Sequence, residues 1–249
     1  MRKPTLWLAA LLTATLLLVI TVFWLLNPEP LKRDPPRLVP WDLPDHRLAT
    51  KQVAYTADGT LKIQVDHALL PGVTPAMVAW FYRILPISTL EYQGVTYPLY
   101  HFFHPTEHGT IWIADAASDG QPGMGQGAVV ARDEWFGPFD SRGAARLTSF
   151  SDAGMVAEAQ VAGIHFVTIR HSFTAAEGGT QYRLEALIGN DLPLIGTLLN
   201  LYLRTQVYHP AMVKEWLRHQ VEEVGSLPFL LPQIYAQRNP VNHYVFIAE

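Results

Sequence analysis

Apolar and polar residues alternate in two short segments between residues 52 and 65, with the period of two that half-buried strands require. Gln52–Thr56 and Leu61–Val65 flank the turn residues Ala57-Asp58-Gly59 and predict a hairpin. Later strand-like runs predict a series of antiparallel strands, over Thr110–Ala114, Ala128–Trp135, Ala145–Ser151, Met155–Val161, Ile164–Phe173 and Thr180–Ile188.

Helical signals stand on either side of these strands. Thr74 before Pro75 is a helix start, because threonine caps the free amides and proline suits the first helical position. Two further helices are predicted over Leu194–Arg204 and Pro210–Val224, with Gly225 placed to end the second. Strands, a helix, many antiparallel strands and C-terminal helices predict an α+β fold, with a helix laid across a curved sheet.

The last predicted helix carries the strongest chemical hint in the chain. Met212, Trp216, His219 and Glu223 follow one another at steps of four, three and four, so they share one helical face. Met and Trp indicate that this face is buried, and a buried histidine and carboxylate need partners. Side chains four residues apart can reach one metal ion, so this pair is a candidate for two metal ligands.

The N-terminus has a different character from the rest of the chain. Residues 5–26 are almost wholly apolar and uncharged, long enough for a helix that spans a bilayer. A cleaved secretory signal is the alternative, but the run is long for a signal core and lacks a small-x-small cleavage pattern. We therefore expect a single-pass membrane protein with residues 1–26 as the anchor. Arg2 and Lys3 favour an N-terminus inside the cell and a domain in the periplasm or outside.

Six prolines fall between Asn27 and Pro44. Proline at that density excludes a helix or an inner strand and favours extended polyproline geometry. The sequence therefore predicts three parts, which are an anchor over residues 1–26, a linker over 27–44 and one domain over 45–249.

Composition narrows the chemistry. The 249 residues carry a formal net charge of −4 and a sequence pI of about 6.2, which gives no reason to expect nucleic acid as a partner. Cysteine is absent, which excludes disulfides and thiolate zinc sites. Any metal must therefore be held by histidine, carboxylates or water.

Two other segments offer such ligands. Residues 100–108 hold His101, His104 and His108, and Pro105 among them predicts a turn. Near the end of one predicted strand, Asp133 and Glu134 point to opposite faces, and alternation alone does not decide which one points inward.

Two more histidines share a face of one predicted strand. His165 and His171 are six residues apart, which at about 3.3 Å per residue is too far for them to hold one ion together. We interpret both as structural.

Taken in order, the stretch Leu69-Leu70-Pro71-Gly72-Val73-Thr74-Pro75, the element Tyr100…His104-Pro105-Thr106-Glu107-His108 and the pair His219-x-x-x-Glu223 resemble the 2,4-diacetylphloroglucinol hydrolase family. The resemblance extends from about Asp66 to Val224. It implies a helix-grip fold, in which a curved antiparallel sheet wraps a long C-terminal helix around an apolar cavity.

The resemblance also implies a zinc ion held by two histidines and two glutamates. Carried over by position, these ligands are His108, Glu134, His219 and Glu223, and Tyr100 matches the tyrosine that the family places before the first zinc histidine. The choice between His104 and His108 as ligand stays open on the residues alone. His108 fits the family spacing, with His104 as a catalytic residue that orients it. Ile111 stands where the family has an asparagine.

The activity so implied is zinc-dependent hydrolysis of the carbon–carbon bond between an acyl group and a phloroglucinol-like aromatic ring. Zinc would polarise the carbonyl or lower the pKa of a bound water, and Tyr100 would hydrogen-bond a substrate oxygen. The candidate catalytic residues are Tyr100, Glu134 and His104. The substrate would be a small apolar or aromatic ketone. The competing hypothesis is a membrane-tethered module that binds an apolar small molecule or a lipid without catalysis.

Overall fold

The computed structural model describes Thr13 and residues 29–161, 163–193 and 195–248. The chain divides into two compact units, Met1–Lys32 and Arg33–Glu249. Almost all of the described residues belong to the second unit, and its architecture positions the chemistry described below.

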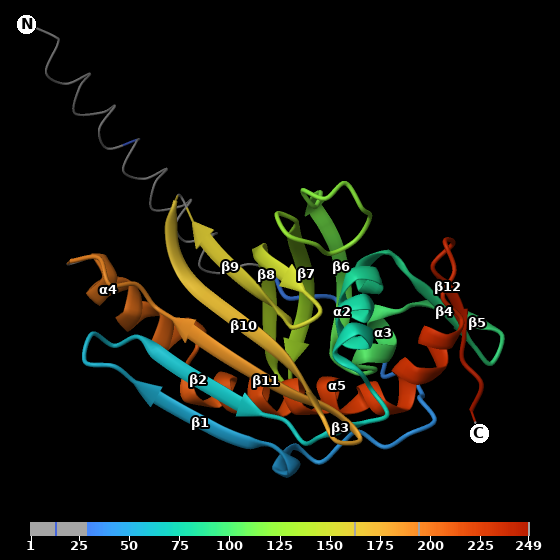
Figure 1. The fold of residues 1–249 in the computed structure, drawn as a ribbon. Helices are drawn as coiled ribbons and strands as arrows, with labels where there is room; N and C mark the ends of the chain where they lie inside the picture. Colours follow the sequence, from blue (N-terminus) through green and yellow to red (C-terminus); the bar gives the residue numbers. More distant parts are fainter. Residues whose placement is uncertain (1–12, 14–28, 162, 194, 249) are drawn as a thin grey trace, which may run out of the picture. The chain divides into compact units, whose positions relative to one another are not determined.

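A nine-stranded antiparallel sheet dominates this unit (Figure 1). The strands run in the order β1-β2-β11-β10-β9-β8-β7-β6, and β3 pairs with β11 beside that path. Their bounds are β1 Thr50–Tyr55, β2 Leu61–Asp66, β3 Leu70–Pro71, β6 His108–Asp115, β7 Val129–Phe136, β8 Phe139–Ser151, β9 Gly154–Val161, β10 Ile164–Ala176 and β11 Gly179–Ile188. The predicted hairpin and the six predicted later strands are all present, with boundaries that differ by a few residues.

Shorter elements close the ends of the sheet. A small second sheet has the order β12-β4-β5, and several helices lie between the strands along the chain. These elements are η1 His46–Leu48, α2 Pro75–Ile84, η2 Leu85–Ile87, β4 Thr89–Tyr92, β5 Val95–Pro98, α3 Tyr100–Phe103, α4 Ile195–Tyr202, the π-helical turn η3 Leu203–Val207, α5 Pro210–Ala236 and β12 His243–Val245. Thr74 caps α2 as predicted, because its hydroxyl accepts from the amide of Met77 at 3.3 Å.

The C-terminal helix α5 runs beside the sheet along its length (Figure 1). The prediction that it ends at Gly225 is wrong, because the helix continues to Ala236 through Pro228 and Pro232. A proline inside a helix costs about 3 kcal/mol, but burial of Leu227, Leu230, Leu231 and Ile234 offsets that cost. Gly225 serves close packing instead, since a Cβ there would lie 2.8 Å from Pro44.

The predicted single-pass membrane protein, with its extracytoplasmic domain, requires correction. Among the described residues, no helix is both long enough and apolar enough to cross a bilayer. The longest of them, α5, carries five charged residues in its first half, from Lys214 to Glu223. The predicted span itself, apart from Thr13, lies outside the described residues.

Part of the predicted linker packs on the domain. Arg37 donates its amide to the carbonyl of Pro105 at 3.0 Å and its guanidinium to the carbonyl of His108 at 2.9 Å. Trp41 stacks on Phe229 with ring centroids 5.9 Å apart. Residues 33–44 therefore fasten the turn that leads into β6.

The α+β class, the large curved antiparallel sheet and the long C-terminal helix are confirmed. Side chains from β6 to β11 and from α2, α3 and α5 line one cavity, so one face of the sheet encloses it together with these helices. On α5, Trp216 and Glu223 line that cavity, and His219 is buried on the same helical face.

Candidate metal centre and its cavity

Four side chains that the sequence singles out lie together in the interior. His108 opens β6 and is paired in register with Glu134 on β7, while His219 and Glu223 are one turn apart on α5. All four are buried. Three elements that are remote in sequence thus bring two imidazoles and two carboxylates to one place.

The atoms of three of these residues have the spacing of metal ligands. Nε2 of His108 lies 3.3 Å from Nε2 of His219 and 3.3 Å from Oε2 of Glu223, and the His219–Glu223 distance is 3.6 Å. Two zinc bonds of about 2.0–2.1 Å at the tetrahedral angle separate their ligand atoms by about 3.3 Å. The triangle formed by His108, His219 and Glu223 therefore has the edges of a tetrahedral zinc site.

The other ring nitrogen of each histidine is already engaged. Nδ1 of His108 donates to the carbonyl of Tyr100 at 2.8 Å, and Nδ1 of His219 donates to Oε2 of Glu107 at 2.9 Å. These bonds place the proton of each neutral ring on Nδ1, so both Nε2 atoms carry lone pairs. Two lone pairs 3.3 Å apart repel each other unless a cation or a shared proton lies between them.

The charges around the centre also favour a cation. The carboxylate of Glu134 faces the guanidinium of Arg132, those of Glu107 and Glu222 face the guanidinium of Arg218, and that of Glu223 faces the two imidazoles. With neutral imidazoles this cluster carries two uncompensated negative charges. A divalent cation neutralises them, whereas buried unpaired charge is strongly unfavourable.

Glu134 stands beside the triangle and does not complete it. Its Oε2 is 4.0 Å from Nε2 of His108 and accepts from the hydroxyl of Tyr100 at 2.8 Å, while Oε1 accepts from Arg132. A site of three close protein ligands keeps a position open, which is the arrangement of catalytic zinc. Glu134 is buried and Asp133 is partly exposed, so the structure decides which of the two acids points inward.

His104 belongs to a second layer behind His219. Its Nε2 lies 3.1 Å from Glu222 and 3.6 Å from Glu107, and its ring stacks on that of His219 with centroids 4.3 Å apart. His104, Glu107 and His219 form another close group. There, however, His219 presents Nδ1, which is already bonded to Glu107.

Glu107 connects the two layers, and the sequence analysis missed its role. It accepts from His219 through Oε2, and from the amide of Gly137 at 2.8 Å and from Arg218 through Oε1. Its only sequence signal is its place one residue before His108. Carboxylates that hold the distal nitrogen of a ligating histidine fix the ring and its tautomer.

The pKa values reflect the crowding of charge. Burial alone would lower the pKa of His219, but its bonds to Glu107 and Glu223 outweigh burial and raise that pKa to about 9. Burial would raise the pKa of Glu223, but its contacts with His108 and His219 bring that pKa below its usual range. Burial lowers the pKa of His108. Without a metal, a proton on His219 takes the place between the two Nε2 atoms.

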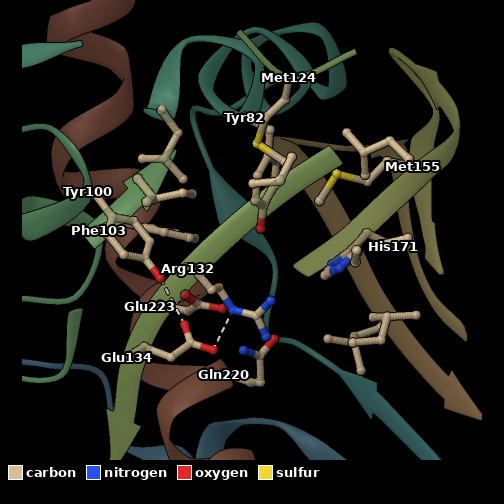
Figure 2. Close-up of a pocket in the computed structure, with 18 of the residues that line it drawn as sticks. Tyr82, Tyr100, Phe103, Met124, Arg132, Glu134, Met155, His171, Gln220 and Glu223 are labelled. Carbon is tan, nitrogen blue, oxygen red and sulfur yellow. Dashed lines mark hydrogen bonds and ion pairs between the residues drawn. The ribbon is translucent and has the colours of Figure 1, made fainter. Parts of the chain in front are cut away.

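Glu134 and Glu223 connect the centre to a cavity of about 120 Å³, which both of them line (Figure 2). Its walls are mostly apolar, built from Met124, Leu147, Met155, Ile169, Leu184 and Trp216. Tyr100, Arg132, Glu134, Gln220 and Glu223 gather at one side, and His171 stands apart from them (Figure 2). A small, largely apolar molecule with a few polar atoms matches this lining.

His171 lies on the cavity wall with a hydrogen-bonded chain behind it. Its Nδ1 is 2.7 Å from the hydroxyl of Tyr182, which is 2.6 Å from the hydroxyl of Tyr82. Burial lowers the pKa of His171 to about 4, so the ring is neutral at pH 7. The sequence assigned it only a structural role, because nothing in the sequence links residue 171 to the other cavity residues.

His67 is a buried histidine whose two ring nitrogens have no hydrogen-bond partner among the described residues. Burial lowers its pKa to about 3, so between about pH 6.5 and pH 3 only the unfolded chain binds this proton. Acid therefore favours unfolding. We expect His67→Phe to stabilise the protein by about 1–2 kcal/mol at pH 7, because it removes unpaired polar groups. It should also reduce the stability lost between pH 7 and pH 5 by about 2 kcal/mol.

Urea unfolding at both pH values measures this effect. His165→Phe is the control, because His165 is partly exposed and bonds Thr168 at 3.1 Å. Equal pH dependence in wild type and His67→Phe would contradict the expectation.

Comparison with known proteins adds likenesses of fold. No protein family and no curated protein matches the sequence. Protein Ms6760 from Mycobacterium smegmatis is 12% identical, with 72% of this chain and 96% of that chain covered and a TM-score of 0.43. A START superfamily protein from the same organism is 12% identical, with coverages of 69% and 98% and a TM-score of 0.43.

The di-domain ARO/CYC protein BexL from the BE-7585A biosynthetic pathway is 10% identical, with 68% of this chain and 52% of that chain covered and a TM-score of 0.38. At such identities and TM-scores, these similarities assign neither a family nor an activity to the chain. The molecule is an α+β protein with a buried His/Glu centre at one side of a small cavity.

Proposed function

We propose that this protein is a zinc-dependent hydrolase that cleaves the carbon–carbon bond between an acyl group and an aromatic ring in a small ketone. Zinc would be held by His108, His219 and Glu223, with Glu134 beside them. The order of these residues along the chain, which resembles that of the 2,4-diacetylphloroglucinol hydrolase family, supports the proposal.

One observation carries it. The Nε2 atoms of His108 and His219 face each other at 3.3 Å, while both Nδ1 atoms donate to acceptors. This arrangement has the spacing and the lone pairs of a metal site, and Glu223 supplies the third edge. A metal that polarises a carbonyl oxygen would supply Lewis acidity at the open position.

The other cavity residues have roles that follow from their contacts. Apolar walls exclude bulk water and hold the ring of the substrate. Tyr100 donates to Glu134 and so fixes that carboxylate next to His108. His171 is neutral and can accept a proton at Nε2 from the attacking water and return it to the ring carbon that leaves. The acyl group leaves as a carboxylic acid and the ring gains hydrogen, so one water is consumed.

The apolar cavity also favours a second candidate function, the binding of a small apolar molecule without catalysis. On that hypothesis His219 and Glu223 are a buried ion pair stabilised by the proton that raises the pKa of His219 to about 9. Metal content separates the two functions, because a binder of this kind does not require zinc.

Removal and return of the metal tests the proposal. We expect the full chain to hold about one zinc per molecule. Chelation should reduce the turnover of phenols that carry an acetyl group on a ring carbon by at least about a hundredfold, and added zinc should restore it. Magnesium should not restore activity, because it prefers oxygen ligands. Release of acetate and the free phenol, followed by chromatography, measures turnover. Turnover that survives complete removal of the metal would refute the proposal.

A further inference from the structure

The polar side of the cavity includes two side chains that the proposed metal chemistry does not use. Arg132 lies on β7 two residues before Glu134, and Gln220 lies on α5 three residues before Glu223. Both line the cavity. Figure 2 shows the guanidinium of Arg132 and the amide of Gln220 close to each other beside the two glutamates.

The guanidinium of Arg132 is only partly paired. Its Nε donates to Oε1 of Glu134, and among the described residues no hydrogen bond is made by its two Nη atoms. The carboxylate of Glu134 raises the pKa of Arg132, so the group stays charged. Two free N–H groups of a guanidinium form a fork that matches two oxygen atoms in one plane.

Gln220 is an independent sign of a ligand. The residue is 8% exposed, yet no hydrogen bond to its amide is present among the described residues. Its amide atoms are not among the fully enclosed polar atoms that lack a partner in the described part of the chain, so the amide faces the open space of the cavity with its donors unused. Its amide NH₂ can donate to an oxygen of a molecule in the cavity, which Arg132 also lines.

We propose that Arg132 and Gln220 form a subsite for an anionic oxygen of the substrate, so that the substrate class is a small ketone that also carries a carboxylate or an ionised phenol or enol. The inference rests on the proposed function, because it assumes that the ketone itself lies at the metal centre. Cross-strand neighbour Ile111 is apolar and lines the same cavity, which leaves Arg132 and Gln220 to recognise the charged group.

The charges at the centre agree with this assignment. Beside a bound divalent cation, Glu134 and Glu223 contribute two negative charges and Arg132 one positive charge. These groups sum to one positive charge at the cavity, while Glu107, Glu222 and Arg218, which do not line it, bring the whole cluster to zero. The positive charge nearest the cavity favours a monoanion over a neutral ketone.

Binding of matched probes tests the subsite. Acetophenone is the neutral probe, 2-acetylbenzoate the carboxylate probe, and 4-acetylphenol the phenol probe, measured on both sides of its own ionisation. We expect calorimetry on zinc-loaded full-length protein to show about 10- to 100-fold tighter binding of one of the two anions than of acetophenone. The anionic probe that binds more tightly identifies the anionic group that the subsite recognises.

Variants show whether the preference comes from this subsite or from the metal. Gln220→Leu leaves the Arg132–Glu134 ion pair intact and should reduce the preference about tenfold, and Arg132→Gln should abolish it. Arg142→Gln, which removes an arginine that is 38% exposed and does not line the cavity, should leave the preference unchanged. Acetophenone should bind wild type and Gln220→Leu within about twofold, which shows that the cavity is intact.

The outcomes separate the two proposals. Equal affinity for the neutral and both anionic probes, or an anion preference that survives Gln220→Leu and Arg132→Gln, would overturn the subsite even if the protein hydrolyses ketones. An anion preference that depends on both residues in a protein without turnover would support the subsite and count against the hydrolase.

Discussion

Glu223→Gln is expected to lower the affinity of the protein for zinc by more than about a hundredfold, so that the purified variant contains almost no metal. The carboxylate lies 3.3 Å from Nε2 of His108 and 3.6 Å from Nε2 of His219, and it supplies one of the negative charges that a cation would neutralise. An amide oxygen has the same shape without the charge. Loss of a bonding partner one shell further out already costs 10- to 100-fold in metal affinity.

Elemental analysis and chelator competition measure this change, and His219→Ala should behave in the same way. The matched control is Asp133→Asn, because Asp133 neighbours Glu134 on β7 but is partly exposed and faces Arg142 at 3.9 Å. Wild-type zinc content is expected in the control. Stoichiometric zinc retained by both Glu223→Gln and His219→Ala would remove these residues from the ligand set.

Local periodicity predicted the elements that build the cavity. The strand-like runs predicted β6 to β11, and in β6, β8 and β11 every second side chain over much of the strand is the less exposed one. The steps of four and three in α5 predicted the shared burial of Met212, Trp216, His219 and Glu223, and all four are buried. These features depend on residues close to one another in sequence, so the sequence contains them.

Contacts between remote segments could not be predicted in the same way. Glu107 bonds His219 across 112 positions, and no spacing rule connects them. The choice between Asp133 and Glu134 depends on the register of β7 with β6, which pairs His108 with Glu134. The continuation of α5 beyond Gly225 depends on burial of its last turns, which outweighs the local effect of Pro228.

The resemblance to a known family predicted part of the site as well. The order of residues brought His108, Glu134, His219 and Glu223 forward as candidate ligands, and the fold brings these side chains together. Whether zinc binds there stays a prediction. The geometry modifies one detail of it, because Glu134 is held by Tyr100 and Arg132 outside the close triangle.

Glu107→Gln is expected to weaken zinc binding by about 10- to 100-fold although Glu107 is not a proposed ligand. Oε1 accepts from the amide of Gly137 and from Arg218, and Oε2 accepts from Nδ1 of His219. Glutamine has one oxygen for these two places. In one orientation its NH₂ meets the N–H of His219, and in the other it meets Gly137 and Arg218, so a buried donor loses its acceptor.

Relief of that conflict moves the proton of His219 from Nδ1 to Nε2 and removes the lone pair that faces His108. The matched control is Glu215→Gln, because Glu215 also accepts from Arg218, at 2.9 Å, but is more exposed and makes no bond to His219. Chelator competition should give equal zinc dissociation constants for wild type and Glu215→Gln, and a dissociation constant about 10- to 100-fold larger for Glu107→Gln. If Glu107→Gln binds zinc as tightly as Glu215→Gln, Glu107 does not set the tautomer of His219. The bond from Nδ1 of His219 to Glu107 would then no longer be evidence that Nε2 of His219 carries a lone pair for the metal.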